Sequence, residues 1–385
     1  MGLRIQDFVA SFGPAWVVMM TNVDAPSVIT AAETGALYGY GLIWLILLLT
    51  VPLFFIQEAS GRIGAVTRKG LGEIIRENYS KRVALFAAVP MALTDLLTYV
   101  AEYMGIAIGM QILGVQPYVS IPAAFLFHLI LVYKRRYAVV ESILVGVSGL
   151  LLISYVGSLF MRGVGAYPLF YFSSNTAFLF LVAANGGALI TPCMPFYQAS
   201  ATAEKNAGST IASRIETLLG AVVSECLIVA IVMVSAGLHQ VSVLDPSALS
   251  AGLKIIAGEF APTLFGIGLV AAGFLALTVI SLGSAWGVAE ALGLPRARAF
   301  RIYLVESIPA AIFAAVASSS LVKSILSLMI VFVFILIGPG IMMGLIASDH
   351  KLMKENASSF LWKIAYWASL MFVISLGLIF LVSSF

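Results

Sequence analysis

Long apolar runs fill this chain from one end to the other. A membrane-spanning helix needs about 20 mainly apolar residues, because only a helix or a closed barrel satisfies its own backbone hydrogen bonds inside lipid. Just 10% of the residues are charged and the mean hydropathy is +1.06, which excludes a soluble globular protein. The sequence therefore predicts an all-α polytopic membrane protein with one transmembrane domain over 1–385. Eleven transmembrane helices are expected, near 9–38, 41–61, 83–113, 117–133, 138–160, 176–203, 209–238, 263–291, 299–320, 323–347 and 360–384.

The distribution of Lys and Arg predicts how the helices are oriented. Basic residues accumulate in the cytoplasmic loops of membrane proteins. With the N-terminus inside, only Arg162, Lys254 and Lys323 of the 21 basic residues fall outside. We therefore expect a multi-pass protein of the plasma membrane with its N-terminus inside and its C-terminus outside. The stretch 246–258 is expected to form a short amphipathic helix on the outer face.

Two of the expected spans are interrupted by proline, and the first also carries a carboxylate. Asp24 lies inside the first apolar run, and Pro26 removes a backbone donor two residues later. The second interruption is Thr-Pro-Cys-Met-Pro at 191–195, in the sixth run. Two Pro-interrupted helices in matching positions of two halves are typical of the substrate site of a secondary transporter.

The spacing of these interruptions predicts a LeuT-like 5+5 inverted repeat with broken helices 1 and 6. Because each repeat has an odd number of spans, the halves face opposite ways and can give alternating access to a midplane site. The expected boundaries are about 9–160 for repeat one, 176–347 for repeat two and 360–384 for an extra helix.

Asp24 is the first candidate for ion binding. A carboxylate near mid-membrane costs several kcal/mol, so it is usually retained for a ligand; protonation or a partner on a neighbouring helix is the alternative. Ser27 offers a hydroxyl and Asn22 an amide, while Ala25 lies at the break itself. Each of these neighbours is a candidate for a direct or an indirect contact with the ion.

The sixth span supplies the opposite side of the expected site. Thr191 offers oxygen atoms, and Met194 offers a thioether, a soft ligand that suits transition metals better than Mg²⁺ or Ca²⁺. Ordinary packing is the alternative role for Met194. Tyr197 and Gln198, one turn later, are expected to support the site or to gate it.

Other acidic residues also fall at membrane depth, where few basic residues are available to pair with them. Glu33 lies beyond Asp24 towards the outer mouth, a position that suits an entry funnel, and Glu102 is a candidate for the ion or proton route. The remaining intramembrane acids are Asp95, Glu141, Glu225 and Glu306.

Several segments together resemble the Nramp family of divalent metal transporters. Asp24-Ala-Pro-Ser27 followed by Glu33-Thr-Gly-Ala is similar to the first-helix motif of that family, and Ala101-Glu102-Tyr-Met-Gly-Ile-Ala107 to its third-helix pattern. The segment 57–77 resembles the exit of the second helix and the loop after it. The resemblance implies a metal site that includes Asp24 and a proton route that includes Glu102.

The chain departs from the family pattern at the metal site, where Ser27 replaces an asparagine. The sixth-helix Met-Pro-His signature can be aligned in two ways. One alignment keeps Met194 and Pro195 and replaces the histidine with Phe196; the other aligns Pro192, with Thr191 at the methionine position. The second alignment looks like a divergent Nramp-related branch that includes magnesium transporters.

These observations predict a secondary transporter of divalent metal ions rather than an enzyme. Loss of soft ligands favours a broadly selective or Mg²⁺-type site, with uncertain proton coupling, over a strict Mn²⁺/Fe²⁺ site. The alternatives are a proton-coupled Mn²⁺/Fe²⁺ transporter of the ordinary Nramp type, a small organic-solute symporter on the same fold, and a channel or sensor. The expected partners are the transported ion and the lipid bilayer; no cofactor and no nucleic acid is expected, and a monomer is consistent with the sequence.

Overall fold

The computed structural model describes residues 12–133, 137–205, 210–238, 241–316 and 320–383, and every regular element in these ranges is helical. Parts of the first, seventh, ninth and eleventh expected spans lie outside the described residues. Within these ranges, nine spans are long and apolar enough to cross a membrane. They are formed by α4 (Ile43–Thr67), α6 (Lys81–Ile112), α8 (Tyr137–Arg162), α9 with α10 (Thr176–Ala188 and Cys193–Lys205), α11 (Thr210–Ser235), α13 (Ala261–Leu292), η1 with α14 (Arg296–Arg298 and Ala299–Val316), α15 with α16 (Ser320–Ile335 and Ile337–Ser348) and α18 (Phe360–Ser383).

Two further expected spans are present in shorter form. The first is divided into α2 (Pro14–Thr21) and α3 (Ala25–Tyr38), and α7 (Pro117–Tyr133) has 17 residues. The expected breaks in the first and sixth spans are both present, at 22–24 and 189–192. The amphipathic segment forms α12 (Pro246–Ala257).

The structure differs from the expectation at two places. The loop expected after the second span contains the helix α5 (Leu71–Asn78), which buries one face, Leu71 with Ile74 and Ile75. The tenth span is interrupted at Leu336, between α15 and α16. Pro339 lies just beyond and has no N–H to donate to the carbonyl four residues earlier, which is a usual cause of a kink.

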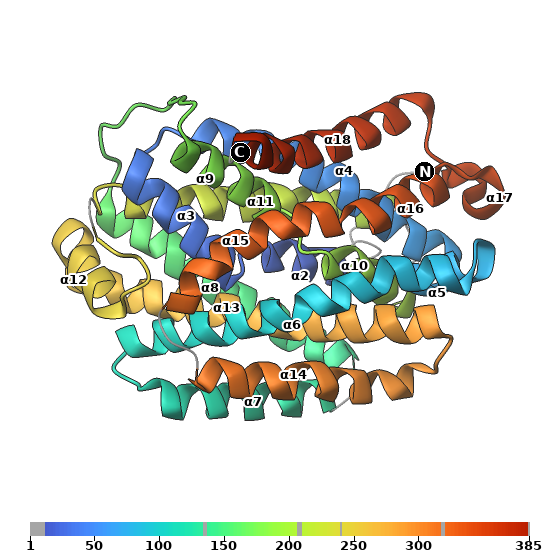
Figure 1. Cartoon of the computed structure of the whole chain (residues 1–385), viewed down its shortest axis with the longest axis horizontal. Helices are drawn as coiled ribbons and strands as arrows, with labels where there is room; N and C mark the ends of the chain where they lie inside the picture. The colour runs from blue at the N-terminus through green and yellow to red at the C-terminus, as the bar shows by residue number, and fades with distance from the viewer. Residues whose placement is uncertain (1–11, 134–136, 206–209, 239–240, 317–319, 384–385) are drawn as a thin grey trace.

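The helices run side by side, with the broken helices at the centre (Figure 1). α7 and α14 form one edge of the bundle in this view, and α4 and α18 lie at the opposite edge. α12 lies at one end of the bundle, whereas α5 and α17 (His350–Met353) lie at the other. α13 packs along α6 and α8, and α11 packs against both α3 and α4. The outward faces carry large apolar side chains such as Phe86, Leu93 and Ile312, as expected for contact with lipid.

Glycines bring the broken first span against its neighbours. A Cβ at Gly35 of α3 would lie 2.2 Å from the carbonyl oxygen of Val232 in α11. A Cβ at Gly105 of α6 would lie 2.2 Å from the Cβ of Ala25, at the break itself. Such small-residue contacts allow membrane helices to approach closely. The position of α3 therefore depends on residues that have no side chain.

We expect Gly35→Ala to lower the free energy of unfolding by about 1–3 kcal/mol, because the backbone of α11 must shift to make room for the methyl group. Thermal unfolding of the purified protein in detergent measures the effect. Gly146→Ala is the matched control, because Gly146 is an exposed residue of α8 and a Cβ there meets nothing within 4 Å. Equal melting temperatures for the two variants would contradict the inferred close approach.

Candidate functional site

Asp24 lies at the break of the first span, where it caps the N-terminus of α3. Its Oδ1 accepts a hydrogen bond of 2.7 Å from the Ser27 N–H. Pro26 follows at the start of the helix, where a missing N–H costs nothing. The carboxylate is only 1% exposed and lies at the positive end of the helix dipole, which stabilises its charge. Part of its hydrogen-bonding capacity remains for a ligand.

A second carboxylate reaches the same helix end from α6. Glu102 is fully buried, and its Oε2 accepts a hydrogen bond of 3.1 Å from the Ala25 N–H. Its Oε1 has no hydrogen-bond partner among the described residues. Asp24 and Glu102 therefore both lie at the N-terminus of α3. Glu102, which was predicted for the ion or proton route, is thus close to Asp24, which was predicted to bind the ion.

The break of the sixth span meets Asp24 from the other side. The Thr191 side chain interacts with the Asp24 carboxylate, while the Thr191 carbonyl accepts a hydrogen bond of 2.9 Å from the Met194 N–H. Met194 lies in the first turn of α10. Asp24, Ser27, Thr191 and Met194 are each at most 3% exposed. The two breaks thus face one another in an enclosed site.

A small cavity lies beside the first break, between α3, α4, α9 and α11. Its volume is about 10 Å³, about the minimum that holds one water molecule. Glu225 of α11 contributes a carboxylate whose Oε1 accepts a hydrogen bond of 2.8 Å from the Asn22 Nδ2. Glu225 was not predicted as a site residue; only its depth in an apolar span marked it. The lining residues are Asn22, Ser27, Ile46, Leu49, Asn185, Ala188, Leu189, Glu225 and Ile228.

Three of the predicted residues lie away from the Asp24 carboxylate. Glu33 is half-buried on α3, two and a half turns beyond the break. The Tyr197 ring stacks on Trp286 of α13, with centroids 6.2 Å apart, and the Gln198 amide donates to the Thr217 hydroxyl at 3.1 Å. Tyr197 and Gln198 thus hold α10 against α13 and α11.

A separate group of buried acids lies between α6 and α14. Glu306 accepts hydrogen bonds from Ser284 at 3.0 Å and from Tyr99 at 3.5 Å, and it interacts with Asp95. Neither Asp95 oxygen has a hydrogen-bond partner among the described residues under strict geometry, although Ser284 and Cys193 lie close to it. None of the ion pairs among the described residues includes either acid. α6 and α14 therefore each offer a buried carboxylate without an ion-pair partner among the described residues.

The N-terminal end of α2 has no capping side chain of its own and is held by polar contacts from other helices. Glu216 of α11 accepts hydrogen bonds from the Gly13 N–H at 2.6 Å and the Trp16 N–H at 2.8 Å. Lys205, the last residue of α10, pairs with Glu141 at 2.7 Å and donates to the Phe12 carbonyl. These contacts connect the start of α2 and the residue before it to α8, α10 and α11.

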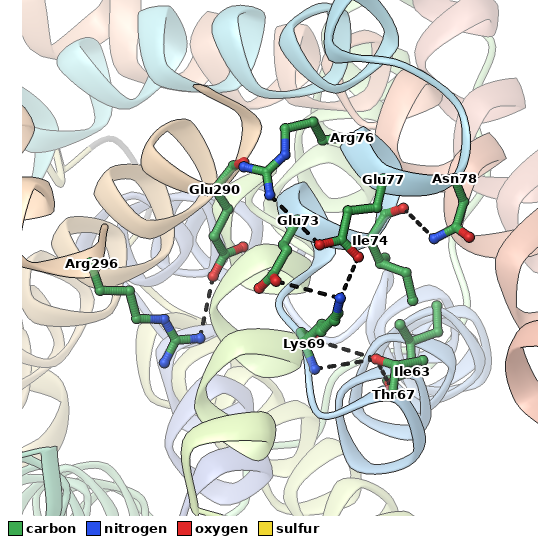
Figure 2. Close-up of polar contacts among 10 residues, drawn as sticks. All are labelled: Ile63, Thr67, Lys69, Glu73, Ile74, Arg76, Glu77, Asn78, Glu290 and Arg296. Atoms are coloured by element: carbon green, nitrogen blue, oxygen red, sulfur yellow. Dashed lines mark hydrogen bonds and ion pairs between the residues drawn. The ribbon is translucent and has the colours of Figure 1, made fainter. Parts of the chain in front are cut away.

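Charged residues also gather where α5 meets α13, and Figure 2 shows their side chains. Lys69 lies between Glu73 and Glu77, and its hydrogen bond to Glu77 raises the pKa of the Lys69 ammonium group. The Arg76 guanidinium donates to the Glu290 carbonyl at 2.6 Å, and the Glu290 carboxylate pairs with Arg296 at 3.3 Å. The segment 57–77, which resembles the Nramp family, thus anchors the end of α13.

The donor set at the two breaks limits the kind of ion that fits. Among the described residues, no group of three or more His, Cys, Asp and Glu side chains is placed to hold a metal. An ion at the breaks would take oxygen ligands from Asp24, Ser27, Thr191, backbone carbonyls and water, together with sulfur from Met194 if that side chain turns inward.

Comparison with known proteins reveals relatives over almost the whole chain. The profile of the family described as "Natural resistance-associated macrophage protein-like", abbreviated Nramp, matches residues 15–383. The protein named divalent metal cation transporter MntH of Verminephrobacter eiseniae is 26% identical over 287 residues, which is 70% of this chain and only 64% of that protein. The protein of the same name from Caldanaerobacter subterraneus is 25% identical over 380 residues, covering 93% of this chain and 89% of that protein.

Solved structures show the same fold. A manganese transporter of Eremococcus coleocola superposes with a TM-score of 0.78 at 16% identity, covering 98% of this chain and 87% of that one. Mhp1, a nucleobase-cation-symport-1 family transporter, gives a TM-score of 0.56 at 12% identity, covering 97% of this chain and 92% of that one. The fold is therefore LeuT-like. The chain is a multi-pass membrane protein that belongs to Nramp, a family of transporters and not of enzymes.

Proposed function

We propose that this protein carries divalent metal ions of the Mn²⁺ class through a membrane by alternating access. The observation that carries the proposal is the enclosed meeting of the two helix breaks, with the Asp24 carboxylate between Ser27 and Thr191. Relatives over most of the chain are named divalent metal cation transporters. Asp24 neutralises the ion, and Ser27, Thr191 and free carbonyls complete its shell.

The comparisons favour Mn²⁺ or Fe²⁺ over the Mg²⁺-type site that the sequence suggested. The similar structure is a manganese transporter, and no comparison points to a magnesium-transporting branch. Met194, fully buried in the first turn of α10, supports the same choice because a thioether distinguishes Mn²⁺ and Fe²⁺ from harder ions. An organic solute is disfavoured, because the cavity at the break has room for about one water molecule.

We also propose that transport is coupled to protons. Glu102 shares the N-terminus of α3 with Asp24, so the charge on one carboxylate affects the other. Asp95 and Glu306 lie further along α6 and α14 without an ion-pair partner among the described residues. Buried carboxylates of this kind need a proton or a cation to offset their charge. They form a path of titratable groups along α6.

The proposed topology contains eleven spans in a single domain. The α2–α3 pair and α7 join the nine longer spans, so that repeat one covers about 9–160, repeat two 176–347, and α18 is the extra helix. α5, which carries the charged cluster, lies at the end of the bundle away from α12 (Figure 1). Lys254 is a residue of α12, and Arg162 ends α8, which contacts α12. By the positive-inside rule, the α5 end and the N-terminus face the cytoplasm of the cell.

The structure corresponds to an occluded state in this mechanism. On the α12 side, Tyr38 stacks on Tyr171 at 5.3 Å and meets Phe178 edge-on at 5.5 Å, which covers the end of α3. On the other side, Glu216 holds the inner end of α2. Opening towards the cytoplasm requires α2 to leave Glu216, while opening outwards requires the Tyr38 contacts to separate.

Asp24→Ala is expected to reduce Mn²⁺ uptake into proteoliposomes by at least about 10–100-fold, since even indirect changes at metal sites have effects of that size. A metal dye and a pH dye inside the vesicles report uptake and acidification with Mn²⁺, Mg²⁺ and Ca²⁺. Glu259→Gln is the control, because Glu259 is an exposed acid that pairs only with Lys254 in the described ion pairs. Wild-type vesicles that take up no Mn²⁺, or equal uptake by Asp24→Ala, would refute the proposal; Mg²⁺ uptake without acidification would restore the magnesium interpretation.

Met194→Ala is expected to weaken Mn²⁺ and Cd²⁺ transport by about tenfold or more while Mg²⁺ flux persists, because only the soft ligand is removed. Concentration dependence of uptake gives the apparent affinities. Met343→Ala provides the same loss of buried volume in α16, away from the breaks. If both variants change Mn²⁺ affinity equally, the sulfur is not a ligand.

Glu216→Ala is expected to favour the inward-open state, because the two N–H groups at the start of α2 lose their acceptor. At about 1 kcal/mol or more for each bond, the open fraction should rise by about tenfold or more. Alkylation of Cys193, which is buried at the start of α10, measures opening in a Cys226→Ser background. Glu216→Gln keeps an acceptor oxygen and should have a smaller effect. Unchanged labelling in Glu216→Ala would show that these bonds do not hold the gate.

A further inference from the structure

The cavity beside the first break contains more oxygen atoms than its own hydrogen bonds use. Glu225 is 3% exposed and accepts one bond from Asn22. Asn22 Oδ1 and Ser27 Oγ are also buried, and neither has a hydrogen-bond partner under strict geometry among the described residues. Each side chain is 3% exposed, and both line the cavity with Glu225. A buried oxygen without a partner costs about 1–3 kcal/mol, so a ligand that satisfies these atoms is stabilising.

The helix ends around this cavity favour a positive charge. Asn22 lies at the C-terminal end of α2, and Ala188 and Leu189 lie at the C-terminal end of α9. Both ends carry the negative pole of a helix dipole. Pro192 has no N–H, so the Ala188 carbonyl has lost the donor that would follow it in a continuous helix. Two negative helix ends and one carboxylate therefore converge on the same small space.

Among the described residues, no basic side chain forms an ion pair with Glu225. The hydrogen bond that its carboxylate accepts comes from the neutral Asn22 amide. By contrast, the Asp24 carboxylate faces the positive N-terminus of α3 and already binds the Ser27 N–H. Compared with Asp24, Glu225 thus lies in the environment that more strongly attracts a cation.

We propose that Glu225, Asn22 and Ser27 form a second cation subsite, next to Asp24, that binds a divalent ion of the transported class. Carboxylate, amide and hydroxyl oxygens are the ligands that Mn²⁺ and Mg²⁺ accept readily. Ser27 connects the two positions, since its N–H donates to Asp24 and the residue also lines the cavity. The subsite lies on the side of the break from which α3 runs towards α12, so an ion exchanging with that side meets Glu225 beside Asp24. This inference rests on the proposed transport of divalent ions.

Binding of Mn²⁺ to the purified full-length protein in detergent tests the subsite, with loss of the free-ion electron paramagnetic resonance signal as the readout. We expect Asp24→Asn to retain one weak Mn²⁺ site. Adding Glu225→Gln to that variant should weaken the remaining binding by at least about tenfold. The glutamine keeps an acceptor oxygen for Asn22, so the change removes charge while preserving the hydrogen bond. Adding Glu259→Gln instead controls for ions bound at surface carboxylates.

Each outcome decides one of the two proposals. If Asp24→Asn elutes as a folded, monodisperse protein but binds no Mn²⁺, or binds it equally with and without Glu225→Gln, the subsite is refuted. Wild-type uptake into proteoliposomes tests transport separately. Absence of uptake together with a Glu225-dependent Mn²⁺ site would reject the transport proposal and keep the subsite.

Discussion

The N-terminus of α3, buried in the middle of the bundle, is the constraint on which the rest of the structure depends. A helix that begins inside a membrane protein exposes N–H groups to a medium that cannot hydrate them. Asp24 and Glu102 satisfy two of these groups from two different helices. The same bonds keep both carboxylates at the break, where the backbone is open to a ligand. The same two hydrogen bonds therefore cap the helix and assemble the site.

The packing of the surrounding helices follows from that requirement. α6 must approach close enough for Glu102 to reach Ala25, and only a glycine at position 105 permits this approach. α11 must lie against α3 at Gly35, and it also brings Glu225 to Asn22 and Glu216 to the start of α2. α11 thus contacts both halves of the broken helix, above and below the break.

Local chemistry explains which features were predictable from the sequence. The breaks at Asp24 and at Pro192 depend on proline and on a charge in an apolar run, and both signals are visible within a few residues. The pairing of Asn22 with Glu225 joins residues 203 positions apart, and that of Ala25 with Glu102 joins residues 77 apart. The sequence marked Asn22, Ala25 and Glu102 as candidates but did not predict these pairings, and it did not mark Glu225 as a site residue. α5 was missed for a related reason, since its short apolar face is buried only by packing against the distant helix α13 and against α6. The Mg²⁺ preference that Ser27 and the missing histidine suggested was not supported by the comparisons. The relatives are named divalent metal cation transporters, and one similar structure is a manganese transporter.

The charged cluster at α5 fixes α10 more firmly than α2, the other half-helix at this end of the bundle. α10 is tied to the scaffold through Ser200, whose hydroxyl donates to Glu290 at 2.7 Å, and Glu290 is in turn held by Arg296 and close to Arg76. α2 has only eight residues and is attached through its first amides. α2 is therefore held through backbone amides at its start, whereas α10 is fixed by a network of polar contacts. In the proposed mechanism, opening at this end of the bundle is therefore asymmetric: α2 moves while α10 stays in place, so that Asp24 changes its position relative to Thr191.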